Sequence, residues 1–121
     1  MKILVTGSRG QLGRTLLTRC PDDFTIVGVD KGDVDIGEAG DVKALVDRER
    51  PDVIVNTAAY TAVDRAETEE DVARRVNVFG ARNVAATGVR LIHLSTDFVF
   101  DGDADEPYAP DAATGPLSAY G

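Results

Sequence analysis

The 121-residue sequence has one cysteine, one histidine and no tryptophan. A lone cysteine, Cys20, cannot form an internal disulfide, so a disulfide-stabilised fold has no support. No cysteine or second histidine lies near His93, which leaves no cluster of metal ligands. The apolar run near the N-terminus, residues 3–5, is too short for a signal peptide or a membrane span. We therefore expect a cytoplasmic protein without a bound metal or a membrane partner.

Basic residues are also scarce: 13 lysines and arginines stand against 21 acidic residues, for a net charge of −8. That balance disfavours nucleic acid as a partner. Residues 97–121 contain no lysine or arginine but six acidic residues and three prolines, which predicts a loop-rich segment. The length and the 43% hydrophobic content are typical of one globular domain, which we place at residues 1–121.

Short apolar runs alternate with helical patterns along the chain. The runs predict strands at 2–6, 24–29, 53–55 and 91–94, the first of them buried on both faces. Apolar spacing predicts helices at 10–20, 38–50 and 69–86, the last with Val72, Val76, Phe79 and Val84 as its buried stripe. This order predicts an α/β fold with a Rossmann-type parallel sheet and helices on both faces. Ligands of such sheets bind at the carboxyl ends of the strands, here the loops 7–13, 30–36, 56–63 and 95–101.

The first of these loops carries Gly7, Gly10 and Gly13 between a strand and a helix. Gly7 allows the tight turn, Gly10 lets a pyrophosphate approach the backbone, and Gly13 lets the helix pack close to the sheet. The free amides at the start of the helix attract phosphate. The spacing therefore predicts a dinucleotide site, and the alternative is a glycine-rich turn without a ligand.

Asp30 ends the second predicted strand, seventeen residues after Gly13. A carboxylate there can accept hydrogen bonds from a ribose 2′-hydroxyl and favours NAD. Arg9 and Lys31 lie nearby and are able to bind the 2′-phosphate of NADP, so the sequence is compatible with either NAD or NADP as the cofactor. Asp35 and Ile36 follow, and they suit the amino group and ring face of an adenine.

Three segments resemble known families. TGSRGQLG (6–13) resembles the glycine loop of the extended short-chain dehydrogenase/reductase superfamily. NTAAYTAVDRAE (56–67) and STDFVFDG (95–102) are similar to the dTDP-4-dehydrorhamnose reductase family, and the resemblance spans the whole chain. It implies an oxidoreductase of dTDP-rhamnose biosynthesis that uses NADP or NAD to reduce the 4-keto group of a dTDP-sugar, dTDP-4-dehydro-L-rhamnose. It also allows a homodimer of the full-length protein.

The resemblance assigns roles residue by residue. Thr96 would bind the substrate carbonyl, and Tyr120 would protonate the reduced oxygen. Asn77 matches an asparagine that helps to position the active site. The expected substrate-binding residues are Asp97, Phe98, Val99 and Phe100. With the residues named above, the expected cofactor-binding set is Gly7, Arg9, Gly10, Gln11, Leu12, Gly13, Asp30, Asp35, Ile36, Ala58, Ala59, Tyr60, Thr61, Asn77 and Ser95.

The sequence departs from the family pattern at two places. Phe98 stands where the family usually has tyrosine, and the lysine of the Y-x-x-x-K motif would fall at position 124, after the last residue, Gly121. We therefore expect an incomplete, dinucleotide-binding portion without a substrate domain and without activity of its own. The alternatives are a non-catalytic dinucleotide-binding regulatory protein of the same fold, or another nucleotide-sugar epimerase or reductase. The presence of both Thr96 and Tyr120 favours the reductase lineage.

Overall fold

The computed structural model describes all 121 residues. Four parallel strands form one sheet in the order β2-β1-β3-β4. The strands are β1 (Lys2–Thr6), β2 (Thr25–Val29), β3 (Val53–Asn56) and β4 (Arg90–His93). The helices are α1 (Gln11–Thr18), α2 (Ala39–Glu49), α3 (Val63–Ala66), α4 (Glu70–Arg74) and α5 (Ala81–Ala85), with a π-helical segment, Arg75–Gly80, between the last two. The predicted α/β Rossmann-type class is confirmed.

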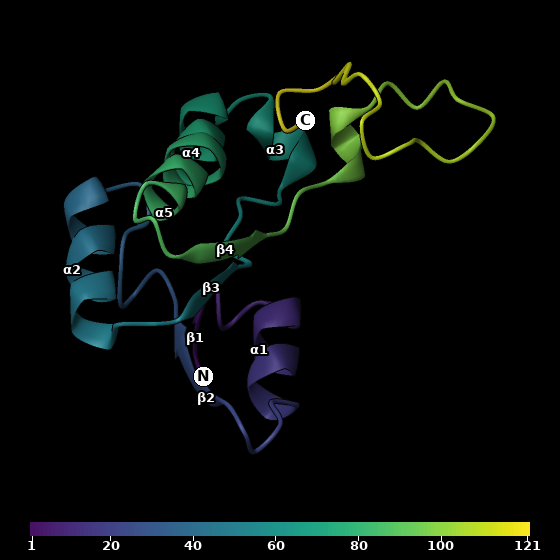
Figure 1. Cartoon of the computed structure of the whole chain (residues 1–121). Coiled ribbons are helices and arrows are strands. Elements are labelled where there is room, and N and C mark those ends of the chain that lie inside the picture. Colours follow the sequence, from purple (N-terminus) through teal and green to yellow (C-terminus); the bar gives the residue numbers. More distant parts are fainter.

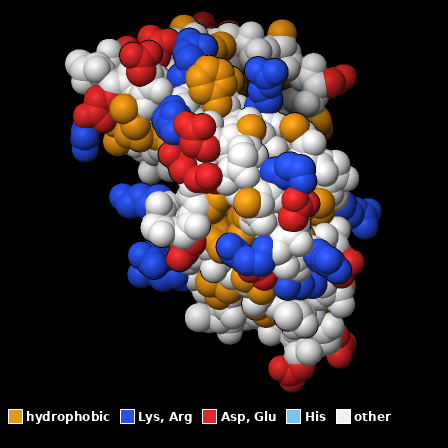
Figure 2. All heavy atoms as spheres, turned by 90° about the vertical axis from the view of Figure 1, so that its left-hand side faces the viewer, with side chains coloured by type: hydrophobic (Ala, Val, Ile, Leu, Met, Phe, Trp, Pro, Cys, Tyr) orange, Lys and Arg blue, Asp and Glu red, His pale blue; other side chains and the backbone are white.

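The strand order places helices on both faces of the sheet. From β1 the chain moves to β2 in one direction, and it then crosses back over β1 to reach β3 and β4. Because parallel crossovers are right-handed, α1 covers one face, and α2, α4 and α5 cover the other (Figure 1). Seen from outside, the face with α2, α4 and α5 carries charged side chains of both signs among scattered apolar ones (Figure 2).

The main core lies between the sheet and α2 with α5. Leu4, Ile54 and Leu91 are neighbours in register on β1, β3 and β4. Alternation along each strand therefore turns all three toward the same face. The buried members of this core are Leu4, Val29, Val34, Ile36, Val42, Leu45, Ile54 and Val84.

The opposite face is covered over β1 and β2 only. There Val5 is fully buried, and Leu17 of α1 packs against Gly28 of β2. Ile92 of β4 shares this face but is 54% exposed, because α1 does not extend over β4. The edge strand β4 is therefore left uncovered on this face.

The helical pattern at 69–86 forms in three pieces, with the π-helical segment in the middle. Val84 is buried and Val76 is half-buried, but Val72 and Phe79 are 46% and 44% exposed. The wider π turn shifts the phase of the helix, so one stripe at α-helical spacing cannot face the core along its whole length. The predicted stripe is thus wrong at these two positions.

The ends of the elements differ from expectation by a few residues. α1 ends at Thr18 and α2 at Glu49, where Arg50 takes a left-handed conformation (φ 47°) ahead of Pro51. After a single 3₁₀ turn, Asp97–Val99, residues 100–121 contain no helix or strand. None of the helices combines the length and the apolar character needed to cross a bilayer.

Candidate functional site

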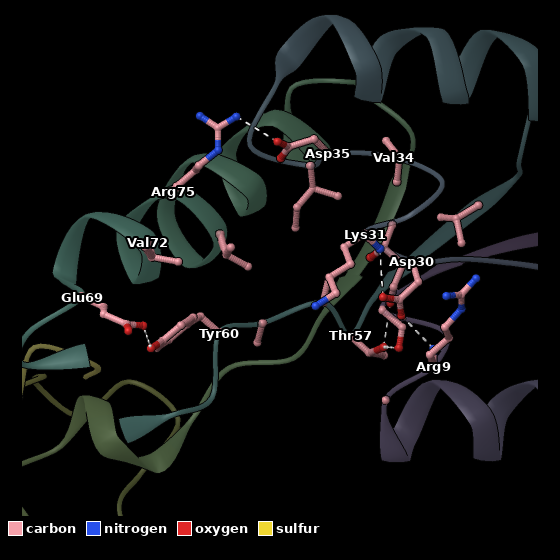
Figure 3. A pocket seen from close by; sticks show the side chains of 18 of the residues that line it. Arg9, Asp30, Lys31, Val34, Asp35, Thr57, Tyr60, Glu69, Val72 and Arg75 are labelled. Carbon is pink, nitrogen blue, oxygen red and sulfur yellow. Dashed lines mark hydrogen bonds and ion pairs between the residues drawn. The ribbon is translucent and has the colours of Figure 1, made fainter. Parts of the chain in front are cut away.

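A cavity of about 720 Å³ lies at the carboxyl ends of the strands (Figure 3). The chain leaves β1 and β3 for opposite sides of the sheet there, which makes this the topological switch point where open α/β sheets bind ligands. The cavity walls come from the loops after β1, β2 and β3, from α3 and α4, and from the π-helical segment. The volume lies within the range of small-molecule and cofactor sites.

The glycine loop packs directly against the loop that follows β3. Gly7 has φ +72°, and a Cβ there would lie 2.6 Å from the amide nitrogen of Ala58. A Cβ on Gly13 would collide with the carbonyl oxygen of Gly7. The first amides of any α-helix have no acceptor within the helix. Gly10 precedes α1 and has no side chain to cap it, so no capping side chain satisfies these amides. This bare backbone cradle fits a diphosphate group, which needs amide donors and a close approach.

A buried hydrogen-bond network supports the cradle from below. The fully buried Asn56 accepts the Thr6 hydroxyl through Oδ1 at 2.5 Å and the Ala58 amide through the same oxygen at 3.3 Å. Its Nδ2 lies 3.0 Å from Nδ1 of His93. His93 is itself exposed, because β4 lies at the sheet edge. Asn56 thus joins β1, β3 and β4 under the site.

Asp30 joins the loops after β1 and β2. Its Oδ2 accepts the Arg9 amide at 2.8 Å and its Oδ1 accepts the Lys31 amide at 2.8 Å. Burial raises the pKa of Asp30, but these two amides and the positive charges of Arg9 and Lys31 outweigh it, and the pKa stays below its ordinary value. The carboxylate is therefore ionised and bound to backbone at neutral pH.

Arg75 closes the adjacent end of the cavity. Its Nη2 donates to Asp35 Oδ2 at 2.9 Å and to Glu38 Oε1 at 2.5 Å, while Gly37 donates its amide to Asp35 Oδ1 at 2.9 Å. The hydrogen bond from Arg75 is the main reason that the pKa of Asp35 lies below its ordinary value. Arg75 could not be predicted as a site residue, because no local spacing in the sequence links it to partners 40 and 37 positions away.

The Asp35–Arg75 ion pair predicts a pH-dependent contribution to stability. Because the pKa of Asp35 is lowered on folding, its contribution is present at neutral pH and is lost as pH falls below about 4. We expect Arg75→Ala to lower the unfolding midpoint at pH 7, and the gap to wild type to narrow progressively as pH falls below about 4. The matched control is Arg74→Ala, which removes the ion pair between Arg74 and Glu70, one helical turn apart. Urea unfolding at a series of pH values measures both variants. An identical pH profile for both variants would contradict the assignment.

Tyr60 is held by both its side chain and its backbone. Its hydroxyl donates to Glu69 Oε2 at 2.5 Å, and Arg65 donates to Glu69 Oε1 at 2.6 Å. The hydrogen bond to Glu69 raises the pKa of Tyr60, and the same bond is the main cause of the lowered pKa of Glu69. Asn77 accepts the Tyr60 amide at 2.8 Å and donates to the Tyr60 carbonyl at 3.0 Å. Asn77 therefore fixes the loop that lines the cavity without lining it itself.

The segment with the expected catalytic residues lies outside the cavity. The Thr96 hydroxyl oxygen accepts the Phe98 amide at 3.2 Å and so caps the 3₁₀ turn. The ring of Tyr120 meets that of Phe98 edge-on, with 5.4 Å between centroids. Phe98 thus contacts both residues, Thr96 through its backbone amide and Tyr120 through its ring. Glu67, the last residue of the NTAAYTAVDRAE motif, accepts the Ala119 amide at 2.9 Å, a role that the motif does not predict.

A family model described as the RmlD substrate binding domain matches residues 1–121. The chain belongs to this family. Among its curated relatives, dTDP-4-keto-6-deoxy-D-glucose reductase of Streptomyces niveus is 46% identical over 98% of this chain and 43% of its own length. dTDP-4-dehydrorhamnose reductase of Streptomyces griseus is 45% identical over 98% of this chain and 40% of its own. The chain thus spans less than half the length of these relatives.

A solved structure agrees with this membership of the RmlD family. The dTDP-4-dehydrorhamnose reductase of Bacillus anthracis, crystallised in complex with NADP, superimposes with a TM-score of 0.94. Its sequence is 39% identical to this chain, and the match covers 98% of this chain and 44% of the length of the relative. The resemblance that the motifs carried is confirmed.

In this RmlD-family chain, nine of the fifteen expected cofactor residues line the cavity: Gly7, Arg9, Gly10, Asp30, Asp35, Ile36, Ala58, Ala59 and Tyr60. The other six lie outside it: Gln11, Leu12, Gly13, Thr61, Asn77 and Ser95. The expected substrate residues, Asp97, Phe98, Val99 and Phe100, also lie outside. The cavity therefore gathers residues of the first three loops, and the segment after β4 forms a separate region.

Glu67 is expected to hold the backbone next to Tyr120. Glu67→Ala removes the acceptor of the Ala119 amide, so we expect exchange of that amide with solvent to speed up about fivefold, as for the loss of one hydrogen bond. Glu67→Gln keeps an acceptor oxygen and should preserve most of the protection. Hydrogen exchange followed by NMR measures both variants. Unchanged protection in Glu67→Ala would show that the bond contributes nothing to order in this segment.

Proposed function

We propose that the switch-point cavity binds NADP(H) or NAD(H), and that the chain is the dinucleotide-binding part of a reductase. The reductase acts on the 4-keto group of a dTDP-6-deoxy-sugar, with dTDP-4-dehydro-L-rhamnose as its substrate. The observation that carries this is the cavity at the switch point of the sheet, which the glycine loop lines with Gly7 and Gly10 ahead of the start of α1. The names of the relatives support the substrate class, and the NADP complex of one solved relative supports the cofactor.

The residues present fit the parts of such a cofactor. The backbone at Gly7 and Gly10 suits the diphosphate, and Ile36 and Asp35 suit the adenine. When bound, the nicotinamide supplies a hydride to the substrate carbon. The protein's own task is then to hold that carbonyl and to deliver a proton to its oxygen.

Thr96 and Tyr120 are suited to that task. Reduction builds negative charge on the carbonyl oxygen, and a positioned hydroxyl donor stabilises it. The Thr96 oxygen accepts the Phe98 amide, and its hydroxyl donates to Asp97 Oδ1 across a long 3.4 Å. A substrate oxygen would take the place of Asp97 as the acceptor of that proton. The Tyr120 phenol acts as the acid that protonates the reduced oxygen. We place this activity in the cytoplasm, since the single cysteine supports no disulfide.

A chimera tests this proposal. Residues 1–121 replace the matching segment of the Streptomyces griseus relative, and oxidation of NADPH is followed with each of two 4-keto sugars, dTDP-4-dehydrorhamnose and dTDP-4-keto-6-deoxy-D-glucose. We expect turnover that falls at least about a hundredfold in Thr96→Val and in Tyr120→Phe, with NADPH binding retained. A folded chimera that binds NADPH but reduces neither sugar would contradict the proposal.

A further inference from the structure

The loop after the 3₁₀ turn contains the only aspartate of the chain that is followed by glycine, Asp101–Gly102, and no asparagine precedes a glycine. Both residues are exposed, and Figure 1 shows this loop projecting away from the sheet. A Cβ on Gly102 would have no atom within 4 Å. Because glycine has no side chain beside its nitrogen, that nitrogen can approach the carboxyl of the preceding aspartate with little hindrance.

The carboxyl of Asp101 is held by two donors. The Tyr108 hydroxyl donates to Asp101 Oδ1 at 2.6 Å, and the Asp103 amide donates to the same oxygen at 3.2 Å. The hydrogen bond from Tyr108 is the main reason that the pKa of Asp101 lies below its ordinary value. The Gly102 amide acts in the same direction, which places its nitrogen close to the carboxyl group. At neutral pH the group is therefore ionised, with the amide of the next residue beside it.

The position of the Tyr108 hydroxyl follows from the packing of its ring. The ring stacks on Phe100 with 4.2 Å between centroids and 4° between planes. Since Phe100 directly precedes Asp101, this stack brings the hydroxyl to the carboxylate. The Gly115 amide donates to the Val99 carbonyl at 2.9 Å and closes the loop. No lysine or arginine occurs in residues 97–121, and the other titratable groups of the loop are acids: Asp103, Asp105, Glu106 and Asp111.

We propose that Asp101–Gly102 is a site of spontaneous isomerisation to isoaspartate, and that the Tyr108 hydroxyl keeps it unreacted by holding the Asp101 carboxyl in its ionised form. The Gly102 nitrogen attacks Asp101 Cγ, so a C–N bond forms and the Cγ–OH bond breaks. The hydroxyl leaves with the amide proton as water, which gives a succinimide. Water then adds at the main-chain carbonyl of Asp101 and breaks its bond to nitrogen, which leaves Gly102 joined through Cγ.

The neutral carboxyl is the reactive form in this step. A neutral acid loses its hydroxyl as water, whereas a carboxylate would have to expel an oxide ion. A donor that stabilises the carboxylate therefore slows the reaction by lowering the neutral fraction. Isomerisation lengthens the main chain by one carbon between Phe100 and Gly102, close to the 3₁₀ turn that carries Phe98. The inference goes beyond the proposed function, because neither a dinucleotide nor a sugar takes part.

Ageing of the 121-residue chain tests the proposal. Wild type and Tyr108→Phe, which keeps the stacked ring and removes only the hydroxyl, are incubated over a range of pH, and isoaspartate at position 101 is measured by peptide mapping with electron-transfer fragmentation. Near pH 6 we expect Tyr108→Phe to isomerise about fivefold faster, the effect of one hydrogen bond. The ratio should shrink as pH falls through about 4, where the carboxyl of the variant becomes protonated.

Two further variants are the controls. Tyr60→Phe removes another hydroxyl that donates to a carboxylate, that of Glu69, and should leave the rate at position 101 unchanged. Asp101→Asn supplies a neutral amide that reacts by the same attack with loss of ammonia, and it should deamidate at this position.

Three outcomes would overturn the proposal. Equal rates in wild type and Tyr108→Phe near pH 6 would show that the hydroxyl does not protect the site. Acceleration by the same factor at every pH would show that the variant acts by loosening the loop and not through the ionised carboxyl. Absence of isoaspartate from both Tyr108→Phe and Asp101→Asn would show that the Gly102 nitrogen does not reach Cγ.

Discussion

Gly7→Ala is expected to lower the free energy of unfolding by about 3 kcal/mol or more, and to reduce dinucleotide affinity at least about tenfold. Two effects combine at this position. The left-handed φ of +72° is unfavourable for alanine by about 1–2 kcal/mol. The added Cβ also meets the backbone at Ala58, 2.6 Å from its nitrogen, and neither loop has a flexible side chain there to move aside. Urea unfolding and calorimetric titration measure the two consequences.

Gly88 provides the control that separates these effects. It has a similar φ of +74°, but a Cβ there would have no atom within 4 Å. Gly88→Ala should therefore show the conformational cost alone, about 1–2 kcal/mol, with dinucleotide affinity unchanged. Equal destabilisation in Gly7→Ala and Gly88→Ala would contradict the close packing of the glycine loop against the loop that follows β3.

Asn56→Ala is expected to destabilise the chain by about 3 kcal/mol. Asn56 is fully buried, and its removal leaves the Thr6 hydroxyl without an acceptor and the Ala58 amide without its side-chain partner. A small cavity remains between β1 and β3 as well. Thermal and urea unfolding provide the measurement.

A second asparagine and a double variant are the controls for Asn56. Asn83→Ala removes a single hydrogen bond, from Nδ2 to the Ile36 carbonyl at 2.9 Å, and should cost only about 1 kcal/mol. Adding Thr6→Val to Asn56→Ala should cost little more, because the hydroxyl has already lost its acceptor. Additive losses from Thr6→Val and Asn56→Ala would show that the two side chains do not depend on each other.

The sheet could be predicted from the sequence because its strands are apolar runs with few alternatives. Leu4 and Ile54 lie in such runs, and both are buried in the main core. The helix at 69–86 was predicted less well. The π-helical segment ends at Gly80, where a Cβ would collide with Ile36, and no spacing of apolar residues reveals such a segment. Exposure of Ile92 likewise depends on how far α1 extends over the sheet.

The residues of the candidate site likewise fall into those that the sequence could predict and those that it could not. Loop residues such as Gly7 and Asp30 could be predicted, because their chemistry follows from their places at strand ends. Arg75 and Glu67 could not, since each acts through a partner 37 to 52 positions away. The role of Asp30 changed for the same reason: its position was visible in the sequence, but the amides that it binds were not.

Titration of the 121-residue chain with NADPH and with NADH tests the central claim most directly, because the cavity and the glycine cradle both lie within this chain. We expect saturable binding at one site per chain, a rise in melting temperature with ligand concentration, and strong loss of both in Gly7→Ala but not in Gly88→Ala. No heat and no thermal shift with either dinucleotide would contradict the assignment of this cavity as a dinucleotide site.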